Sequence, residues 1–243
     1  MRFQREKLLI GEENFKKLEE SHIIVFGVGG VGGFVVEALV RAGVGKITVV
    51  DFDTIDITNI NRQIIANEKT IGKDKVKIIE ERMKEINPKL MIRGIKEKYS
   101  SETRNIFFDE EYDYIVDAID IVTAKLDLIE MANEKNISII SSMGTGNKIN
   151  PMMLEITDIN KTSVCPLARV MRKELKERRI KKLKVVYSKE VPIKPLNLDG
   201  NREKSSNVGS ISFVPSVAGL IIGSEVVKDI CKIKNTNGKI ERK

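Results

Sequence analysis

The sequence predicts an α/β fold in which helices cover both faces of a mostly parallel sheet. Short apolar runs typical of buried strands alternate along the chain with longer segments whose apolar residues recur at helical spacing. A glycine-rich run directly follows the first apolar run, as is typical of the turn from a strand into a helix in such sheets. Ligands of these folds bind outside the carboxyl ends of the parallel strands.

The first part of the chain contains most of the expected elements. Strands are expected at residues 22–26, 46–50, 90–95, 114–116 and 138–142. Helices are expected from the glycine run to residue 42, at 73–87, where Pro88 stops the helix, and at 121–136. Residues 1–151 are therefore expected to form the core of the fold.

The pattern changes after Met152, and residues 152–243 are expected to form a C-terminal strand and basic-helix extension. Its expected elements are a strand at 153–157, a basic helix at 166–179, a strand at 184–186, a polar, mobile loop at 188–208 and an apolar C-terminal core helix. The apolar run 213–233 contains Glu225, Lys228 and Asp229, so it is too charged to span a membrane.

The composition excludes several kinds of site. The 243 residues include one histidine, His22, and two cysteines, Cys165 and Cys231, too few for the usual structural zinc sites or a disulfide framework. The first 20 residues are charged throughout and contain no apolar leader. We therefore expect a cytoplasmic protein that does not interact with membranes.

The glycine run predicts a Rossmann-like nucleotide site. Gly27, Gly29, Gly30 and Gly32 stand between the first strand and the first long helix, where backbone amides can approach a phosphate. Asp51 ends the next strand, 19 residues beyond Gly32, close to the spacing of about 20 expected for a ribose-binding carboxylate.

The glycine run and Asp51 are compatible with two kinds of enzyme, a nicotinamide dehydrogenase and a nucleotide-activating enzyme. Hydride transfer needs a proton-handling partner, yet His22 begins its strand at the end remote from ligands, and no tyrosine has a lysine four residues later. Instead, the acids and cations of the run 51–63 follow the second predicted strand, Lys73 and Lys75 begin the next helix, and Asp117 and Asp120 follow the strand 114–116. Cations can neutralise a triphosphate and a carboxylate can hold Mg²⁺, so ATP is the favoured ligand.

In the order of these motifs, the chain resembles the ThiF/MoeB/ubiquitin-activating superfamily of adenylating enzymes from about Arg2 to Met143. The matching residues are Gly27 to Gly32, Gly43-Val44-Gly45, Asp51 and Asp53, Asn59, Arg62 and Gln63, Lys75, and Asp117 and Asp120. The resemblance implies that the glycine turn holds the phosphates and Asp51 the ribose, with Asp53 and Gln63 also in the nucleotide site. It assigns Arg62, Lys75 and Asp120 to the triphosphate and Mg²⁺, and Asn59 to a supporting contact. Arg5 would reach the ATP of the partner subunit in a homodimer.

Three later segments narrow the resemblance to one branch. Residues 158–175, 185–190 and 209–220 are similar to the dehydratases that cyclise threonylcarbamoyladenosine in tRNA, and the Cys-x-x-Cys pairs usual in sulfur-carrier activators are absent. The branch implies that ATP adenylates the threonyl carboxylate and that AMP leaves as the ring closes. Two alternatives are an activator of a ubiquitin-like or sulfur-carrier protein and an idle nucleotide-binding module. Gly33 departs from the serine frequent in relatives.

The basic charge is concentrated in one stretch. Residues 161–195 contain 12 Lys and Arg against three acids, whereas the rest of the chain contains 30 against 32. The residues expected to bind tRNA phosphates are Arg169, Arg172, Lys173, Lys176, Arg179, Lys181 and Lys182, with a solvated helix as the alternative. The sequence leaves two further possibilities undecided: a cysteine-desulfurase or sulfur-acceptor partner, and a covalent role for Cys165. Cys231 is expected to lie in the core.

Overall fold

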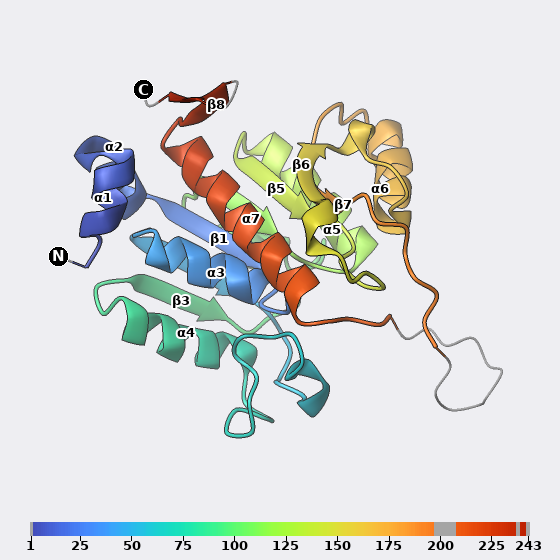
Figure 1. The fold of residues 1–243 in the computed structure, drawn as a ribbon, viewed down its shortest axis with the longest axis horizontal. Coiled ribbons are helices and arrows are strands. Elements are labelled where there is room, and N and C mark those ends of the chain that lie inside the picture. Colours follow the sequence, from blue (N-terminus) through green and yellow to red (C-terminus); the bar gives the residue numbers. More distant parts are fainter. Residues whose placement is uncertain (1, 197–207, 237–238, 242–243) are drawn as a thin grey trace.

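A computed structural model of the chain describes residues 2–196, 208–236 and 239–241, and its centre is one seven-stranded sheet (Figure 1). The strands are β1 His22–Phe26, β2 Lys46–Val50, β3 Met91–Ile95, β4 Tyr114–Asp117, β5 Ser138–Ser142, β6 Leu154–Asp158 and β7 Lys184–Ser188. Their order is β3-β2-β1-β4-β5-β7-β6, and all neighbours are parallel except β6 and β7. The predicted α/β fold with a mostly parallel sheet is confirmed.

The helices agree with the sequence-based expectation to within a few residues at their ends. They are α1 Gln4–Ile10, α2 Glu12–Glu20, α3 Gly32–Arg41, α4 Lys75–Ile86, α5 Val122–Glu134, α6 Pro166–Glu177 and α7 Phe213–Ile230. Helices α1 and α2 and a hairpin of β8 (Lys234–Thr236) and β9 (Lys239–Glu241) are additional to the predicted elements. Among the described residues, no helix is both long and apolar enough to cross a membrane.

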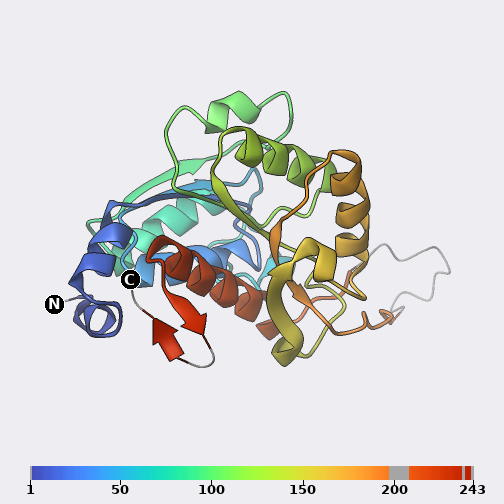
Figure 2. The same ribbon diagram turned by 90° about the horizontal axis from the view of Figure 1, so that it is seen from above.

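Both faces of the sheet are covered because the side chains of each strand alternate between them. In β1, Ile23 and Val25 belong to the apolar core beneath α3, α4 and α7, whereas Ile24 and Phe26 pack in the core that contains residues of α5. Figures 1 and 2 show α3, α4 and α7 on one face of the sheet and α5 with α6 on the other. Helix α6 packs against α5 through Met171 and Leu175.

The C-terminal extension continues the same sheet. Strand β7 lies parallel to β5, so the proposed boundary at residue 151 falls within one continuous sheet. Helix α7 packs closely on α3, since a Cβ atom at Gly219 would lie 2.4 Å from the carbonyl oxygen of Val31. Residues 189–196 of the predicted mobile loop have no regular structure, and residues 197–207 lie outside the described part of the chain.

Candidate active site

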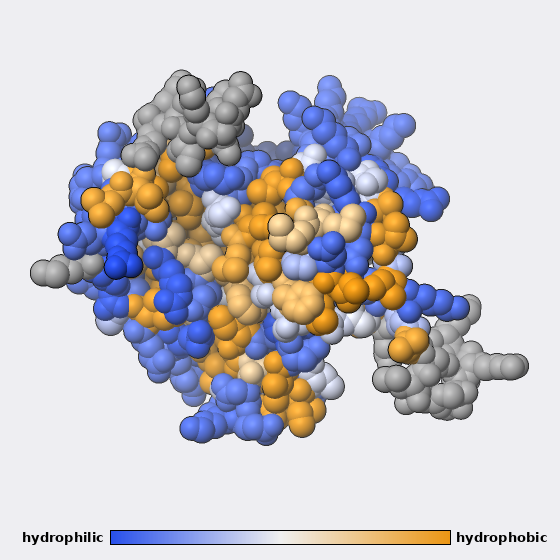
Figure 3. Space-filling view, in the orientation of Figure 1, coloured by the Kyte–Doolittle hydropathy of each residue, from blue (hydrophilic) through white to orange (hydrophobic). Residues whose placement is uncertain are grey.

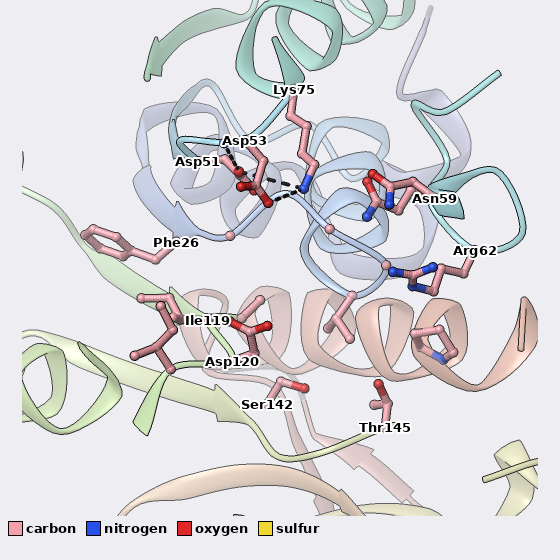
Figure 4. A pocket seen from close by; sticks show the side chains of 18 of the residues that line it. Phe26, Asp51, Asp53, Asn59, Arg62, Lys75, Ile119, Asp120, Ser142 and Thr145 are labelled. Carbon is pink, nitrogen blue, oxygen red and sulfur yellow. Dashed lines mark hydrogen bonds and ion pairs between the residues drawn. The ribbon is translucent and has the colours of Figure 1, made fainter. Parts of the chain in front are cut away.

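A cavity of about 900 Å³ opens at the carboxyl ends of β1, β2, β4 and β5 (Figure 4). One side, which we call the nucleotide half, is formed by the glycine turn, residues 50–63, Lys75 and the residues after β4. The other side, the β5 half, is formed by residues 142–146, Leu167, and Val208, Ser210 and Pro215. The cavity therefore lies where the fold class predicts a ligand.

Two glycines of the turn are required by its geometry. Gly27 has φ +87°, and a Cβ atom there would lie 2.7 Å from the carbonyl oxygen of Ala118. A Cβ atom at Gly32, the first residue of α3, would lie 1.8 Å from the oxygen of Gly27. The turn thus brings bare backbone and the positive end of the α3 dipole to the cavity, as a phosphate site needs.

Asp51 stands at the end of β2 and lines the cavity while remaining nearly buried. Its carboxylate accepts hydrogen bonds from the backbone N–H of Val28 (2.7 Å) and of Asp53 (2.9 Å). Burial raises the pKa of Asp51, and the nearby Lys75 ammonium opposes that rise. The two backbone bonds hold the carboxylate at the edge of the glycine turn, where it can accept further bonds from a ribose.

Lys75 is the first residue of α4, and its ammonium points toward the two aspartates of the nucleotide half (Figure 4). Its Nζ lies 2.7 Å from Asp53 Oδ2 and 3.9 Å from Asp51 Oδ1. The lysine is buried, whereas the Asp53 side chain is 47% exposed, so the pair places a desolvated cation at the cavity wall. Such a cation interacts strongly with phosphate because little water screens it.

The segment that follows Asp53 presents an amide, an arginine and a glutamine to the cavity. Asn59 and Asp56 form a reciprocal capping box that fixes the short helical turn, so the side-chain oxygen of Asn59 is used within the protein. Arg62 donates to the carbonyl oxygen of Thr58 at 2.8 Å and makes no ion pair with a described residue. Gln63 Oε1 is buried without a hydrogen-bond partner among the described residues. An unpaired buried acceptor beside the glycine turn indicates a site that a ligand or water completes.

Asp117, the last residue of β4, and Asp120, three residues later, lie in different surroundings. Asp117 is fully buried, does not line the cavity, and forms an ion pair with Lys125 at 2.9 Å and a hydrogen bond with Ser141. Asp120 is exposed, points into the cavity (Figure 4), and has no polar partner among the described residues. Asp120 is therefore the carboxylate available to a ligand.

Two residues with predicted roles lie away from this cavity. Arg5 is exposed on α1 and does not line the cavity of its own chain, so its predicted reach into a partner subunit remains a prediction. His22 is buried, and its ring nitrogens contact the carbonyl oxygen of Glu111 and the hydroxyl of Thr48, both at 2.9 Å. Its expected structural role is confirmed.

Several residues that line the cavity belong to no sequence motif and were not predicted as site residues. Phe52, Lys98 and Tyr99 also line the cavity, and the Lys98 ammonium lies 5.7 Å from the centroid of the Phe52 ring. The β5 half consists mainly of small or apolar residues from segments 142–146 and 208–215. The available signal was positional: Lys98 and the β5 loop follow predicted strands at their carboxyl ends.

The basic segment divides into paired and unpaired cations. Arg169, Lys173 and Lys176 of α6 are exposed, as are Arg179, Lys181 and Lys182 after it, and none forms an ion pair with a described residue. Arg172 differs from the expectation because its side chain is half-buried and donates to the carbonyl oxygen of Thr162 at 3.1 Å and to the Thr162 hydroxyl. The basic surface, as used below, consists of the six exposed cations without Arg172.

Both cysteines are buried. Cys165 precedes Pro166 at the start of α6 as expected, but its thiol lies in the core behind the β5 half and does not line the cavity. Cys231 follows the end of α7 rather than lying within it, and burial raises the pKa of its thiol to about 11. Its expected place in the core is confirmed.

The comparisons with known proteins agree with this geometry. The model of the ThiF family matches residues 3–241. A tRNA threonylcarbamoyladenosine dehydratase of Bacillus subtilis is 42% identical over 241 residues, which cover 95% of this chain and 94% of that protein. One of Haemophilus influenzae is 33% identical over 92% of this chain and 90% of its own length. The crystal structure of the Escherichia coli dehydratase TcdA in complex with AMP has a TM-score of 0.86 at 31% identity, covering 94% of this chain and 93% of that one, and its ATP complex has 0.85. The chain belongs to the ThiF family.

Proposed function

We propose that the chain is an ATP-dependent tRNA threonylcarbamoyladenosine dehydratase. The observation that carries the proposal is the nucleotide half, a glycine cradle flanked by Asp51, Lys75, Arg62 and Asp120, in a chain that matches dehydratases over almost its whole length. The threonyl carboxylate attacks the α-phosphorus of ATP, which releases pyrophosphate and leaves an acyl adenylate. An atom of the same side chain then displaces AMP from the acyl carbon, so the nucleoside loses one water in total.

The residues of the nucleotide half fit ATP. A Cβ atom at Gly30 would lie 3.3 Å from both Arg62 Cγ and Pro215 Cβ, so the turn, the arginine and the start of α7 meet closely around the phosphate side. Asp51 and the unpaired Gln63 oxygen supply acceptors for the ribose hydroxyls. Lys75 and Arg62 stabilise the negative charge that develops on the α-phosphoryl oxygens.

Asp120 fits a magnesium site. Mg²⁺ in phosphoryl-transfer enzymes is bound by one or two carboxylates together with phosphate oxygens and water, so a single free carboxylate facing the phosphate cradle is sufficient from the protein. When bound, the ion neutralises the charge of the triphosphate. Asp120 would hold it, and the glycine turn would orient the phosphates toward it.

The basic surface fits tRNA. Its α6 residues stand on the same helix as Leu167, which lines the β5 half of the cavity, so this surface lies within one helix of the site. Unpaired exposed lysines and arginines bind phosphates in a salt-dependent way. A tRNA-modifying enzyme with two free thiols suits the cytoplasm. We leave a sulfur-relay partner out of the proposal because both thiols are buried.

A homodimer is part of the proposal. Phe213 and Leu220 of α7 and Val191 are exposed apolar side chains. Figure 3 shows apolar surface across the face of the molecule that α7 covers. Apolar patches of this kind mark interaction surfaces, and a second copy is the partner that would bring Arg5 to a neighbouring cavity.

The test is incubation of the protein with ATP, Mg²⁺ and tRNA that carries threonylcarbamoyladenosine, with unmodified tRNA as the control. The expected result is AMP formation and a loss of one water from the modified nucleoside by mass spectrometry, with neither seen for the control. AMP formation only in the presence of a ubiquitin-like carrier protein would instead support the carrier activator, which uses the same nucleotide half. No turnover with either substrate would favour an idle nucleotide-binding module.

A further inference from the structure

One residue, Asn147, joins three segments behind the β5 half of the cavity. Its backbone N–H donates to the carbonyl oxygen of Gly209 at 2.7 Å, and its side-chain oxygen accepts from the N–H of Gly209, also at 2.7 Å. Its own carbonyl oxygen accepts from the N–H of Ile193 at 2.7 Å. Asn147 thereby ties the loop after β5 to the chain before residue 197 and to the chain after residue 207.

The backbone of Asn147 has an uncommon conformation that its residue type tolerates. Its φ is +59°, in the left-handed region that Asn adopts more readily than other residues with a Cβ. In this conformation both the backbone N–H and the side-chain oxygen of Asn147 bond to the same residue, Gly209. The conformation and the bonds support each other.

The segments that Asn147 ties together are those that form the cavity wall. Gly144, Thr145 and Gly146 line the β5 half from one segment, and Val208 and Ser210 line it from the other. The two segments touch, since a Cβ atom at Gly146 would lie 2.1 Å from Val208 Cγ1. The wall therefore depends on the register of two segments about 60 residues apart, and Asn147 sets that register.

Two further side chains brace the same loop. The buried ammonium of Lys148 donates to the carbonyl oxygen of Gly144 at 2.8 Å. The Glu190 carboxylate accepts from the backbone N–H of Ile149 at 3.0 Å and of Asn150 at 2.9 Å. The loop is thus held from both of its ends, which leaves its central glycines fixed against the cavity.

This wall lies across the cavity from the nucleotide half. Ser142 and Thr145 lie across the cavity from Asp51 and Lys75 (Figure 4). Next to them is Leu167, in the first turn of the helix that carries the unpaired cations of the basic surface. A tRNA bound to that surface would bring its modified base to the β5 half.

We propose that Asn147 is a positioning residue for the tRNA substrate: it holds segments 144–146 and 208–210 together as the wall against which the modified nucleoside binds. The inference rests on the proposed function. Asn147 does not itself line the cavity, so it acts through the neighbouring wall residues and leaves the nucleotide half unchanged.

Three substitutions at Asn147 distinguish the contribution of its left-handed backbone from that of its side-chain hydrogen bond. Asn147→Asp keeps the acceptor for Gly209 and tolerates the left-handed backbone; Asn147→Gly keeps only the backbone; Asn147→Ala keeps neither. We expect the apparent KM for the modified tRNA to rise about tenfold in Asn147→Ala and about threefold in Asn147→Gly, and to be close to that of the original protein in Asn147→Asp. The Kd for ATP, measured by calorimetry without tRNA, should be the same in all four proteins.

Hydrogen exchange at the Gly209 amide gives a readout without turnover. It should be faster in Asn147→Gly than in the original protein and should return to the original rate in Asn147→Asp. Equal KM values for all four proteins, an ATP Kd that rises together with KM, or an unchanged exchange rate in Asn147→Gly would each overturn the inference. If the unsubstituted protein does not turn over modified tRNA, the proposed function fails and the inference fails with it; if it does, the KM comparison tests Asn147 alone.

Discussion

The two halves of the cavity are built in different ways. The nucleotide half uses glycines, the buried carboxylate of Asp51 and a lysine paired with Asp53, drawn largely from one stretch, residues 27–75. The β5 half uses mostly uncharged residues from three distant segments, and Asn147, Lys148 and Glu190 hold them from behind. A phosphate site needs particular residue types, because only bare backbone and compensating charges can hold it. The β5 half presents mainly small and apolar side chains, and many residue types can supply such a surface.

From this difference we expect that, among single substitutions, replacement of Asp120 lowers the rate of AMP formation most. Asp120→Ala should lower AMP formation about a thousandfold, since the triphosphate loses its metal-holding carboxylate. The thermal midpoint should hardly change, because the side chain is exposed and unpaired among the described residues. AMP measured by chromatography checks the rate.

Asp109→Ala is the matched control for Asp120→Ala. Asp109 is also an exposed aspartate, but it pairs with Arg93 and does not line the cavity. Its substitution should leave AMP formation unchanged. Turnover retained in Asp120→Ala would remove Asp120 from the magnesium role and weaken the distinction between the two halves.

The second prediction concerns the buried pair at the end of β4, which supports both halves. Asp117 and Lys125 are both fully buried, and Lys125 also donates to the carbonyl oxygen of Ile119, which lines the cavity. Lys125→Met should lower the free energy of unfolding by about 3 kcal/mol because it leaves an uncompensated carboxylate in the core. Urea denaturation measures the loss.

A surface lysine gives the comparison for this pair. Lys16 makes an exposed pair with Glu20, so Lys16→Met should cost less than about 0.5 kcal/mol. Combining Asp117→Leu with Lys125→Met should recover much of the lost stability, since an apolar pair can replace a buried ion pair. A loss below about 1 kcal/mol in Lys125→Met would show that Asp117 is not held as a charged group.

The nucleotide half was largely predictable from the sequence for the same reason that it is chemically demanding. Glycines, Asp51, Lys75 and Asp120 stand at the ends of periodic apolar runs, and that periodicity gives both the strand and the end of the strand that faces the ligand. The strand pattern alone does not separate Asp117 from Asp120, because both stand near the end of one strand, and only the family resemblance assigned the ligand role to Asp120. Only the tertiary position of Lys125 makes the first a core residue.

The β5 half could not be predicted, because its wall depends on contacts between distant segments. Nothing in the local pattern pairs Asn147 with Gly209, and a left-handed Asn is indistinguishable in sequence from any polar loop residue. Arg172 shows the same limit on the basic helix: its charge predicts a phosphate contact, and the nearby Thr162 takes up the guanidinium instead. Residue type predicts a possible contact, and packing decides whether it is free.

The third prediction tests whether the basic surface serves the β5 half. Reversing the charge at three unpaired positions, Arg169→Glu, Lys173→Glu and Lys176→Glu together, should weaken tRNA binding about thirtyfold or more at low salt. The slope of log affinity against log salt should fall by about three, since three phosphate contacts are lost. The Kd for ATP should not change.

The control carries the same charge change on another surface. Lys77, Lys84 and Lys89 are exposed along α4 and just after it, and their triple replacement by Glu should leave the salt slope close to that of the original protein. If both triple variants weaken tRNA binding equally, the loss of affinity comes from the change in net charge and not from the basic surface. Arg172→Gln should leave the slope unchanged, because that guanidinium is bound to Thr162.

The smallest effect concerns Lys148, the buried lysine behind the β5 half. Lys75 pairs with Asp53 in the nucleotide half, whereas Lys148 behind the β5 half has no carboxylate within ion-pair distance among the described residues. Burial lowers the pKa of Lys148 from its ordinary 10.5, although Cys165 and Glu190 oppose the shift. Between the lowered value and 10.5 the unfolded chain binds more protons than the folded one, so the contribution of Lys148 to stability increases as pH rises through that window.

Lys148→Met removes this contribution, so the unfolding free energy of the original protein should increase relative to that of the variant as pH rises toward 10.5. The difference should change by no more than about 1.4 kcal/mol per pH unit, the limit for one proton. Urea denaturation at several pH values measures it, and Lys77→Met, an exposed lysine, should give a curve parallel to that of the original protein. A parallel curve for Lys148→Met as well would mean that the ammonium is solvated, and that the β5 wall is braced by the bonds of Asn147 and Glu190 alone.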